Sequence, residues 1–200
     1  MYINGYPGVS HNHLFIDPVA PLVNRTSPEY DTTRTNFRRH ILDVIATSEA
    51  TRDPVWIFAD SRFSEVGSAA PKDYRDAAEK RDVPFTPLIM TCGADENARR
   101  VVDEYRGELG CTKLMDIGVL KGIREKEQMC RFGGRDELEV DVSNLSPREA
   151  AENNVEHVLK VAALQVYPCT GASRLSGDEG LGRRDIQCSM ISLLKQTTKW

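Results

Sequence analysis

The chain has 200 residues and a formal net charge of −4, with acidic and basic residues interspersed. This length suffices for one compact domain with a substantial core. The charge leaves no basic footprint for nucleic acid, and no apolar run approaches the roughly 20 residues that a membrane helix needs. The N-terminus shows no secretory signal. We therefore expect a cytoplasmic protein without nucleic-acid or membrane partners.

Cysteine and histidine give no sign of a metal centre. The cysteines number five, which is odd, and none form a C-x-x-C, so neither a disulfide framework nor a zinc site is expected. His11 and His13 form an H-x-H that could suggest a metal. The alternative, which we favour, is that both are solvated or packed side chains, so no metal ligand is predicted.

Strands are predicted from apolar and β-branched runs. These are "MYIN" (1–4), "HLFID" (13–17), "VWIFAD" (55–60), "FTPLIMTC" (85–92) and "ELEVDVSN" (137–144). The run at 55–60 is continuous enough for a strand buried on both faces of a parallel sheet. The run at 137–144 alternates with charges, as in an edge strand. Pro87 is expected near a strand start.

Helices are predicted between these strands. Helical spacing of apolar residues marks the ranges 27–51, 67–81, 95–108 and 116–129, and a further helix follows "SPRE" (146–149). Ser27 is the expected N-cap of the first, with Pro28 at its first position. Phe37, Ile41, Val44 and Ile45 are expected on its apolar face, and Val102 and Tyr105 on that of 95–108. Ser146 and Glu149 form a capping box.

This alternation predicts the α/β class, as a three-layer doubly wound parallel sheet. The domain is expected to span residues 1–165. Residues 166–200 are rich in Gly and Ser and show no apolar period over most of their length. We therefore expect them to form a flexible tail.

The loop after the first strand begins like a phosphate-binding motif. In the P-loop G-x-x-x-x-G-K-[ST], glycines let backbone N–H groups wrap the phosphates, the lysine reaches the β- and γ-phosphates, and the hydroxyl binds Mg²⁺. Gly5, Pro7 and Gly8 supply the first half, but Ser-His-Asn at 10–12 replaces Gly, Lys and Ser/Thr. The alternative interpretation is an ordinary β-turn.

A series of further segments carries a resemblance to a known family. In order they are "NGYPGV", "NHLFIDPVAPLVNRTSPEY", "TRDPVWIFADSR", "VGSAAPKDYRDAAEKRDVPF", "TCGADENARRV", "TKLMDIGVL" and "VSNLSPREAAE". Over roughly residues 1 to 160 the chain resembles P-loop kinases similar to chloramphenicol phosphotransferase and to nucleoside-monophosphate-type kinases. The resemblance implies a P-loop NTPase-like fold, ATP and Mg²⁺ as cofactors, and phosphate transfer to a hydroxyl of a small-molecule acceptor that the sequence does not identify.

The chain departs from this family at the phosphate loop. Relatives of this kind carry G-x-P-G-x-G-K and a full helix before the segment that matches "NHLFID", whereas here only Ser10 and His11 lie between Val9 and that segment. Parallel neighbours need a crossover of about a dozen residues or more, which residues 5–12 do not provide. We therefore expect the first helix to be missing. Either "MYIN" shifts or frays, or one face of the sheet loses its cover.

The resemblance also implies candidate catalytic residues after the run at 55–60. Asp60 ends that run and Arg62 follows closely. The carboxyl ends of strands face the ligand crevice in doubly wound folds. An aspartate there can bind Mg²⁺ through water or accept the proton of an attacking hydroxyl. The alternative is a helix-capping or turn aspartate, which is also the interpretation that we favour for Asp17.

Candidate nucleotide contacts come later in the chain. Arg106 and Lys113 lie where P-loop kinases carry a lid, whose cations stabilise the migrating phosphoryl group. Asn144, in "SNLSP" (143–147), matches the loop that packs against adenine in such kinases. The alternatives are a solvated basic helix face over 99–124 and a simple strand-to-helix turn.

These residues lead to one favoured hypothesis and two alternatives. The favoured one is an ATP-dependent phosphotransferase by ancestry, with strongly impaired catalysis because the Gly-Lys-Ser/Thr is absent. The second is a catalytically dead P-loop relative that acts as a binding or regulatory module. The third is an incomplete gene product that lacks a helix-coding piece and carries an unrelated tail.

Overall fold

The structure, a computed structural model, describes residues 1–5, 13–61, 69–103 and 114–166. These residues form a four-stranded parallel sheet with the order β2-β1-β3-β4. The strands are β1 (Tyr2–Gly5), β2 (Phe58–Asp60), β3 (Pro87–Thr91) and β4 (Leu138–Asp141). The predicted α/β class with a parallel sheet is confirmed.

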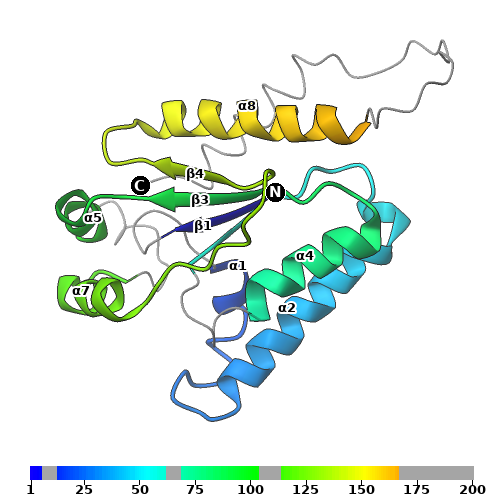
Figure 1. Cartoon of the computed structure of the whole chain (residues 1–200). Coiled ribbons are helices and arrows are strands. Elements are labelled where there is room, and N and C mark those ends of the chain that lie inside the picture. Colours follow the sequence, from blue (N-terminus) through cyan, green and yellow to red (C-terminus); the bar gives the residue numbers. More distant parts are fainter. Residues whose placement is uncertain (6–12, 62–68, 104–113, 167–200) are drawn as a thin grey trace, which may run out of the picture.

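Helices lie on both faces of the sheet. Figure 1 shows α8 (Pro147–Val166) over one face and α2 (Tyr30–Thr47) with α4 (Ala69–Arg81) on the other. Two shorter helices, α5 (Ala94–Val101) and α7 (Ile117–Lys126), lie beyond the arrowheads of the strands (Figure 1). None of the described helices is long and apolar enough to cross a bilayer.

Strand β1 lies inside the sheet, and its residues Tyr2, Ile3 and Asn4 are fully buried. Its side chains alternate between the two faces, as the pleat of a strand requires. Tyr2 joins a cluster with Phe15, Leu42 and Tyr74, whereas Ile3 joins the core on the other face. That core also contains Leu88, Met90, Cys92, Val142, Ala150, Ala151 and Val155. The possibility that "MYIN" shifts or frays is therefore wrong.

The prediction of a strand at 13–17 is wrong. Residues His13–Ile16 form a short helix, α1. Because residues 5–12 are too few for a parallel crossover, this segment cannot lie parallel beside β1 or β2 in the usual way. Only part of its apolar surface is buried: the Phe15 side chain is buried with its ring 6.3 Å from the rings of Phe37 and Phe58, whereas Leu14 is exposed.

The prediction for the run at 55–60 needs correction as well. The strand covers only Phe58–Asp60, and it lies at one edge of the described sheet. The expected burial on both faces is confirmed only in part, because Phe58 packs on the cluster at one face and Ala59 on the core at the other, but both side chains are only partly buried. Ile57 and Ala59 pack against the core that α8 covers, yet they are only partly buried.

Predicted helix ends differ from the observed ones by a few residues. Helix α2 begins at Tyr30, and its N-cap is Glu29 rather than Ser27. The Ser27 hydroxyl accepts a hydrogen bond from the Glu29 N–H at 3.3 Å, which holds the turn that precedes the helix. Leu42 is buried in this helix, whereas Val44 is exposed, because the contact face is rotated from the predicted one.

The later elements follow their local sequence signals. Asp116 caps α7 by accepting the Val119 N–H at 3.0 Å. The predicted capping box is confirmed, since the Glu149 carboxylate accepts the Ser146 N–H at 2.8 Å. Pro87 is the first residue of β3, and β4 is an edge strand with alternating burial. Helix α5 ends at Val101, and Val102 is exposed instead of inward.

Helices α2 and α4 are joined by a buried ion pair. An Arg38 side-chain nitrogen lies 2.6 Å from an Asp73 carboxylate oxygen, and only 2% of the Arg38 side chain and 12% of that of Asp73 are exposed. The Arg38 Nε also donates to Asp73 at 3.2 Å. The pair fixes how the two helices pack below β1.

Candidate functional site

The order of the strands locates the crevice of this fold. The chain passes from β1 to β2 on one side and then crosses to β3 on the other side of β1. Ligands of open α/β sheets bind outside the carboxyl ends of the strands at such a switch point. Gly5 ends β1 there, aligned with Met90 of β3. The candidate site is therefore the carboxyl edge of the sheet.

Asp60 lies at this edge and is fully buried. It ends β2 and is aligned with Asn4 of β1, so it lies one strand away from Gly5. One carboxylate oxygen accepts the Ser61 N–H at 2.8 Å and the other accepts the Tyr74 hydroxyl at 3.3 Å. These bonds fix the carboxylate and also fit the alternative of a structural turn aspartate.

Asn144 lies at the same edge but on the opposite side of the sheet. It is exposed in the loop between β4 and α8 and lines a hollow of about 310 Å³. Strands β2 and β4 are three strand spacings apart, which corresponds to roughly 14 Å. The structure therefore brings Gly5 and Asp60 together and places Asn144 apart from them.

Arg100 holds the loop that carries Asn144. This buried guanidinium donates to the Val142 carbonyl at 2.8 Å and to the Ser143 carbonyl at 3.3 Å. On the other side of the hollow, the Gly93 N–H donates to the Ser143 hydroxyl at 2.7 Å. The loop is thus fixed to α5 by backbone and side-chain bonds.

Charges on α5 interact mainly with one another. Hydrogen bonds from Arg99 and Arg100 lower the pKa of Glu96 to about 2, and Arg124 of α7 donates to Asn97 at 3.0 Å. The exposed Arg99 fits the alternative of a solvated basic helix face, whereas the buried Arg100 does not. The i, i+3 and i, i+4 spacing of Glu96 from the two arginines was the sequence signal for this arrangement.

Asn4 is a buried polar residue that the sequence interpretation missed. Its side-chain nitrogen donates to the Cys130 carbonyl at 3.1 Å, which ties the carboxyl end of β1 to the segment before β4. A polar residue inside an apolar strand was the available signal. Asn4 therefore shapes the floor of the candidate site.

The remaining predicted site residues lie outside the described residues. These are Pro7, Gly8, Arg62, Arg106 and Lys113, and His11 of the H-x-H lies there too. In the part of the chain that is described, no group of three His, Cys, Asp or Glu side chains could hold a metal ion. Both Asp60 oxygens already accept protein hydrogen bonds. The described residues therefore do not make a protein-bound Mg²⁺ site.

No family model, curated protein or solved structure matches this chain. The geometry at the carboxyl edge of the sheet and the sequence of the loop after β1 thus carry the functional argument.

Proposed function

We propose that the chain is an ATP-dependent phosphotransferase of the P-loop kinase kind by ancestry, acting on a small-molecule hydroxyl, with a severely impaired nucleotide site. The observation that carries this proposal is the adjacency of Gly5 and Asp60 at the carboxyl edge. Gly5 opens the Gly-Tyr-Pro-Gly sequence, and it ends the strand that flanks the topological switch. Phosphate loops occupy this place in nucleotide-binding α/β folds.

The roles of the residues follow from their positions. Asp60, oriented by Ser61 and Tyr74, accepts the proton of the attacking hydroxyl once a substrate is bound. The loop that begins at Gly5 faces the phosphates, and the hollow beside Asn144 takes the adenine end of ATP. Binding is weak because the loop sequence lacks the lysine that reaches the β- and γ-phosphates in a P-loop.

A second candidate function is a non-catalytic binding relative of such kinases. The burial of Asp60 favours it, because a carboxylate with both oxygens bonded to the protein has no route to a substrate proton unless the edge opens. The two candidates differ in whether ATP turnover depends on Asp60 after the phosphate loop is restored.

Titration calorimetry with Mg-ATP tests the proposed function. We expect the chain as it stands to bind ATP weakly or not at all, and a low-micromolar dissociation constant, roughly −8 kcal/mol, would contradict the claim of an impaired site. A variant with Gly-Lys-Thr, an amphipathic helix and a short connector inserted after Val9 is expected to gain binding.

The matched control carries the same insertion with Gly-Ala-Thr. It restores the helix without the lysine, so it separates a gain in folding from a gain in phosphate binding. Equal ATP affinity of the two insertion variants would contradict the role assigned to the lysine. A folded Gly-Lys-Thr variant that binds no ATP would show that the kinase proposal is wrong.

A further inference from the structure

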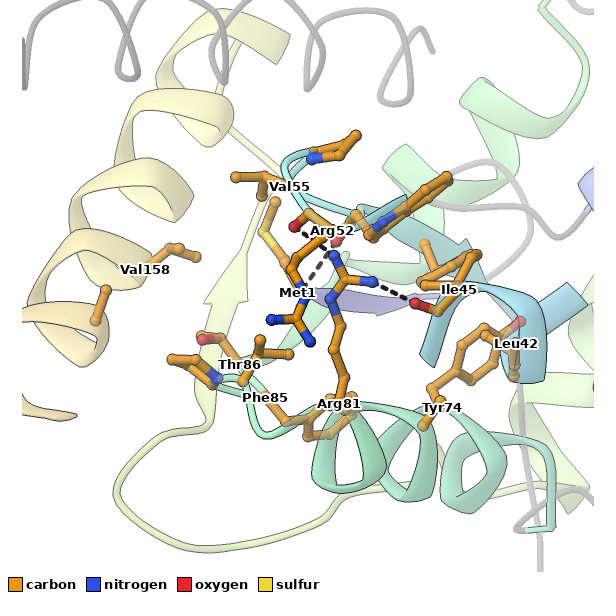
Figure 2. A pocket seen from close by; sticks show the side chains of 18 of the residues that line it. Met1, Leu42, Ile45, Arg52, Val55, Tyr74, Arg81, Phe85, Thr86 and Val158 are labelled. Atoms are coloured by element: carbon orange, nitrogen blue, oxygen red, sulfur yellow. Dashed lines mark hydrogen bonds between the residues drawn. The ribbon is translucent and has the colours of Figure 1, made fainter. Parts of the chain in front are cut away.

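A cavity of about 380 Å³ opens at the amino edge of the sheet. Its walls come from the starts of the strands, the last turns of α2 and α4, and the second half of α8. Figure 2 shows Met1, Phe85 and Thr86 at the strand starts, with Leu42 of α2 and Val158 of α8 around them. The candidate nucleotide site lies at the carboxyl edge, so the cavity is a separate site.

The walls of the cavity are apolar and belong to regular elements. Trp56 and Phe58 stack with their ring centroids 6.3 Å apart on one side. Ala77, Ala78 and Ala162 line it as well, and their small side chains leave space between helices α4 and α8. Ligand pockets are typically apolar hollows of about 300–1,000 Å³ with a few polar groups that orient the ligand.

The charged side chains of this cavity are cationic. Arg52 and Arg81 line it, and its described lining residues include no acidic side chain. Arg81 donates to the carbonyls of Ile45 and Arg52 (Figure 2) and to that of Thr51, all of which are uncharged acceptors. The Arg52 guanidinium lies 3.1 Å from Glu49, but both side chains are largely exposed, so this pair is weak. The opening of the cavity therefore carries the positive charges of Arg52 and Arg81, and Glu49, which is exposed to solvent, is the one acidic partner described for them.

We propose that this cavity binds a free medium-chain fatty carboxylate. The alkyl chain lies between the aromatic rings and the alanines, where its transfer from water is favourable. The carboxylate lies at the mouth, where it accepts hydrogen bonds from Arg52 and is attracted by the positive charge of Arg81, whose terminal nitrogens already donate to the protein. This ligand site does not depend on the phosphotransferase proposal.

Titration calorimetry of the full chain with octanoate, and with 1-octanol as the neutral probe of equal length, tests the proposal. We expect one octanoate per chain and at least tenfold weaker binding of octanol. Arg52→Gln is expected to weaken octanoate binding about tenfold, as for one lost charged hydrogen bond, and to leave octanol binding unchanged. Arg135→Gln is the control, because this exposed arginine pairs with Asp136 and does not line the cavity.

Filling the cavity gives a second, independent measurement. Ala78→Phe and Ala162→Phe enter from opposite walls, and either variant that keeps a cooperative melting transition is expected to lose octanoate binding. The proposal is wrong if the unmodified chain binds no octanoate or binds octanol equally well. It is also wrong if a folded filled variant binds octanoate with unchanged affinity.

Discussion

At the scale of single residues, the Arg38–Asp73 pair is the contact where a small change has the largest expected effect on stability. Arg38 is 2% exposed, and its Nε and a terminal nitrogen both donate to one Asp73 oxygen. Asp73→Ala would leave a buried charge without its counter-ion, which costs about 3 kcal/mol. Urea denaturation is expected to show this loss in the free energy of unfolding.

The Lys80–Asp43 pair offers a matched comparison between the same two helices. Its atoms are also 2.6 Å apart, but both side chains are more than half exposed. Asp43→Ala is therefore expected to cost less than about 1 kcal/mol. Equal losses in the two variants would contradict the assignment of burial as the decisive factor.

Glu96 predicts a dependence of stability on pH. Its pKa falls from 4.5 to about 2 because Arg99 and Arg100 donate to it in the folded state. A carboxyl group whose pKa is lower in the folded state stabilises the fold at pH values above its pKa in the unfolded chain. This stabilisation is lost as the pH falls toward the pKa of the folded state. The side chain is 26% exposed, so solvent screening limits the contribution to about 1 kcal/mol.

Comparison of Glu96→Gln with the unmodified chain checks this effect. The difference in unfolding free energy is expected to be full at pH 7 and to shrink between about pH 4.5 and pH 2. Glu79→Gln, at an exposed position of α4, serves as the control and should show a small, constant difference. A difference in unfolding free energy between Glu96→Gln and the unmodified chain that does not change with pH would contradict the stabilising interaction of Glu96 with Arg99 and Arg100.

Part of the candidate site could be predicted from single residues. Gly5 and Asp60 were found because strand ends can be recognised from apolar runs that stop at a polar residue or a glycine. The role of Arg100 was not predicted, because it depends on the Val142 carbonyl, 42 residues away in the chain. A charge pattern cannot show that an arginine is buried against a distant backbone.

At the scale of elements, the capping box of α8 is open to a direct test. The Ser146 hydroxyl accepts a hydrogen bond from the Glu149 N–H at 3.3 Å, and the Glu149 carboxylate accepts one from the Ser146 N–H. Ser146→Ala is expected to lower the free energy of unfolding by about 1 kcal/mol. Arg148→Ala, at an exposed position two residues further along the chain, should cost less, and a larger loss there would argue against the cap.

Local signals explain which elements could be predicted. The caps at Asp116 and Ser146 and the position of Pro87 each act within a few residues, and the corresponding elements are found as expected. The segment 13–17 failed, because a short apolar run fits a strand or a helix equally well. The short connection between β1 and residue 13 excludes a parallel strand there. That limit depends on the length of the connection and cannot be recognised from the residues of the segment itself.

At the scale of the whole molecule, the sheet reflects the short connection after β1. The described sheet has β2 at its edge, where Phe58 and Ala59 are only partly buried, whereas Tyr2 and Ile3 of β1 and Leu88, Ile89 and Met90 of β3 are fully buried. The parallel order and the switch point were predictable from alternating strands and helices. The edge position of β2 was not, because it followed from the wrong assignment at 13–17.

The most direct test of the central claim is ATP turnover by the chain with Gly-Lys-Thr and a helix inserted after Val9. We predict no turnover above buffer for the unmodified chain, measurable turnover after the insertion, and its loss when Asp60→Asn is added to the inserted chain without a change in cooperative melting. An inserted chain that melts cooperatively yet leaves ATP intact, or an unmodified chain that turns over ATP equally fast, would contradict the account.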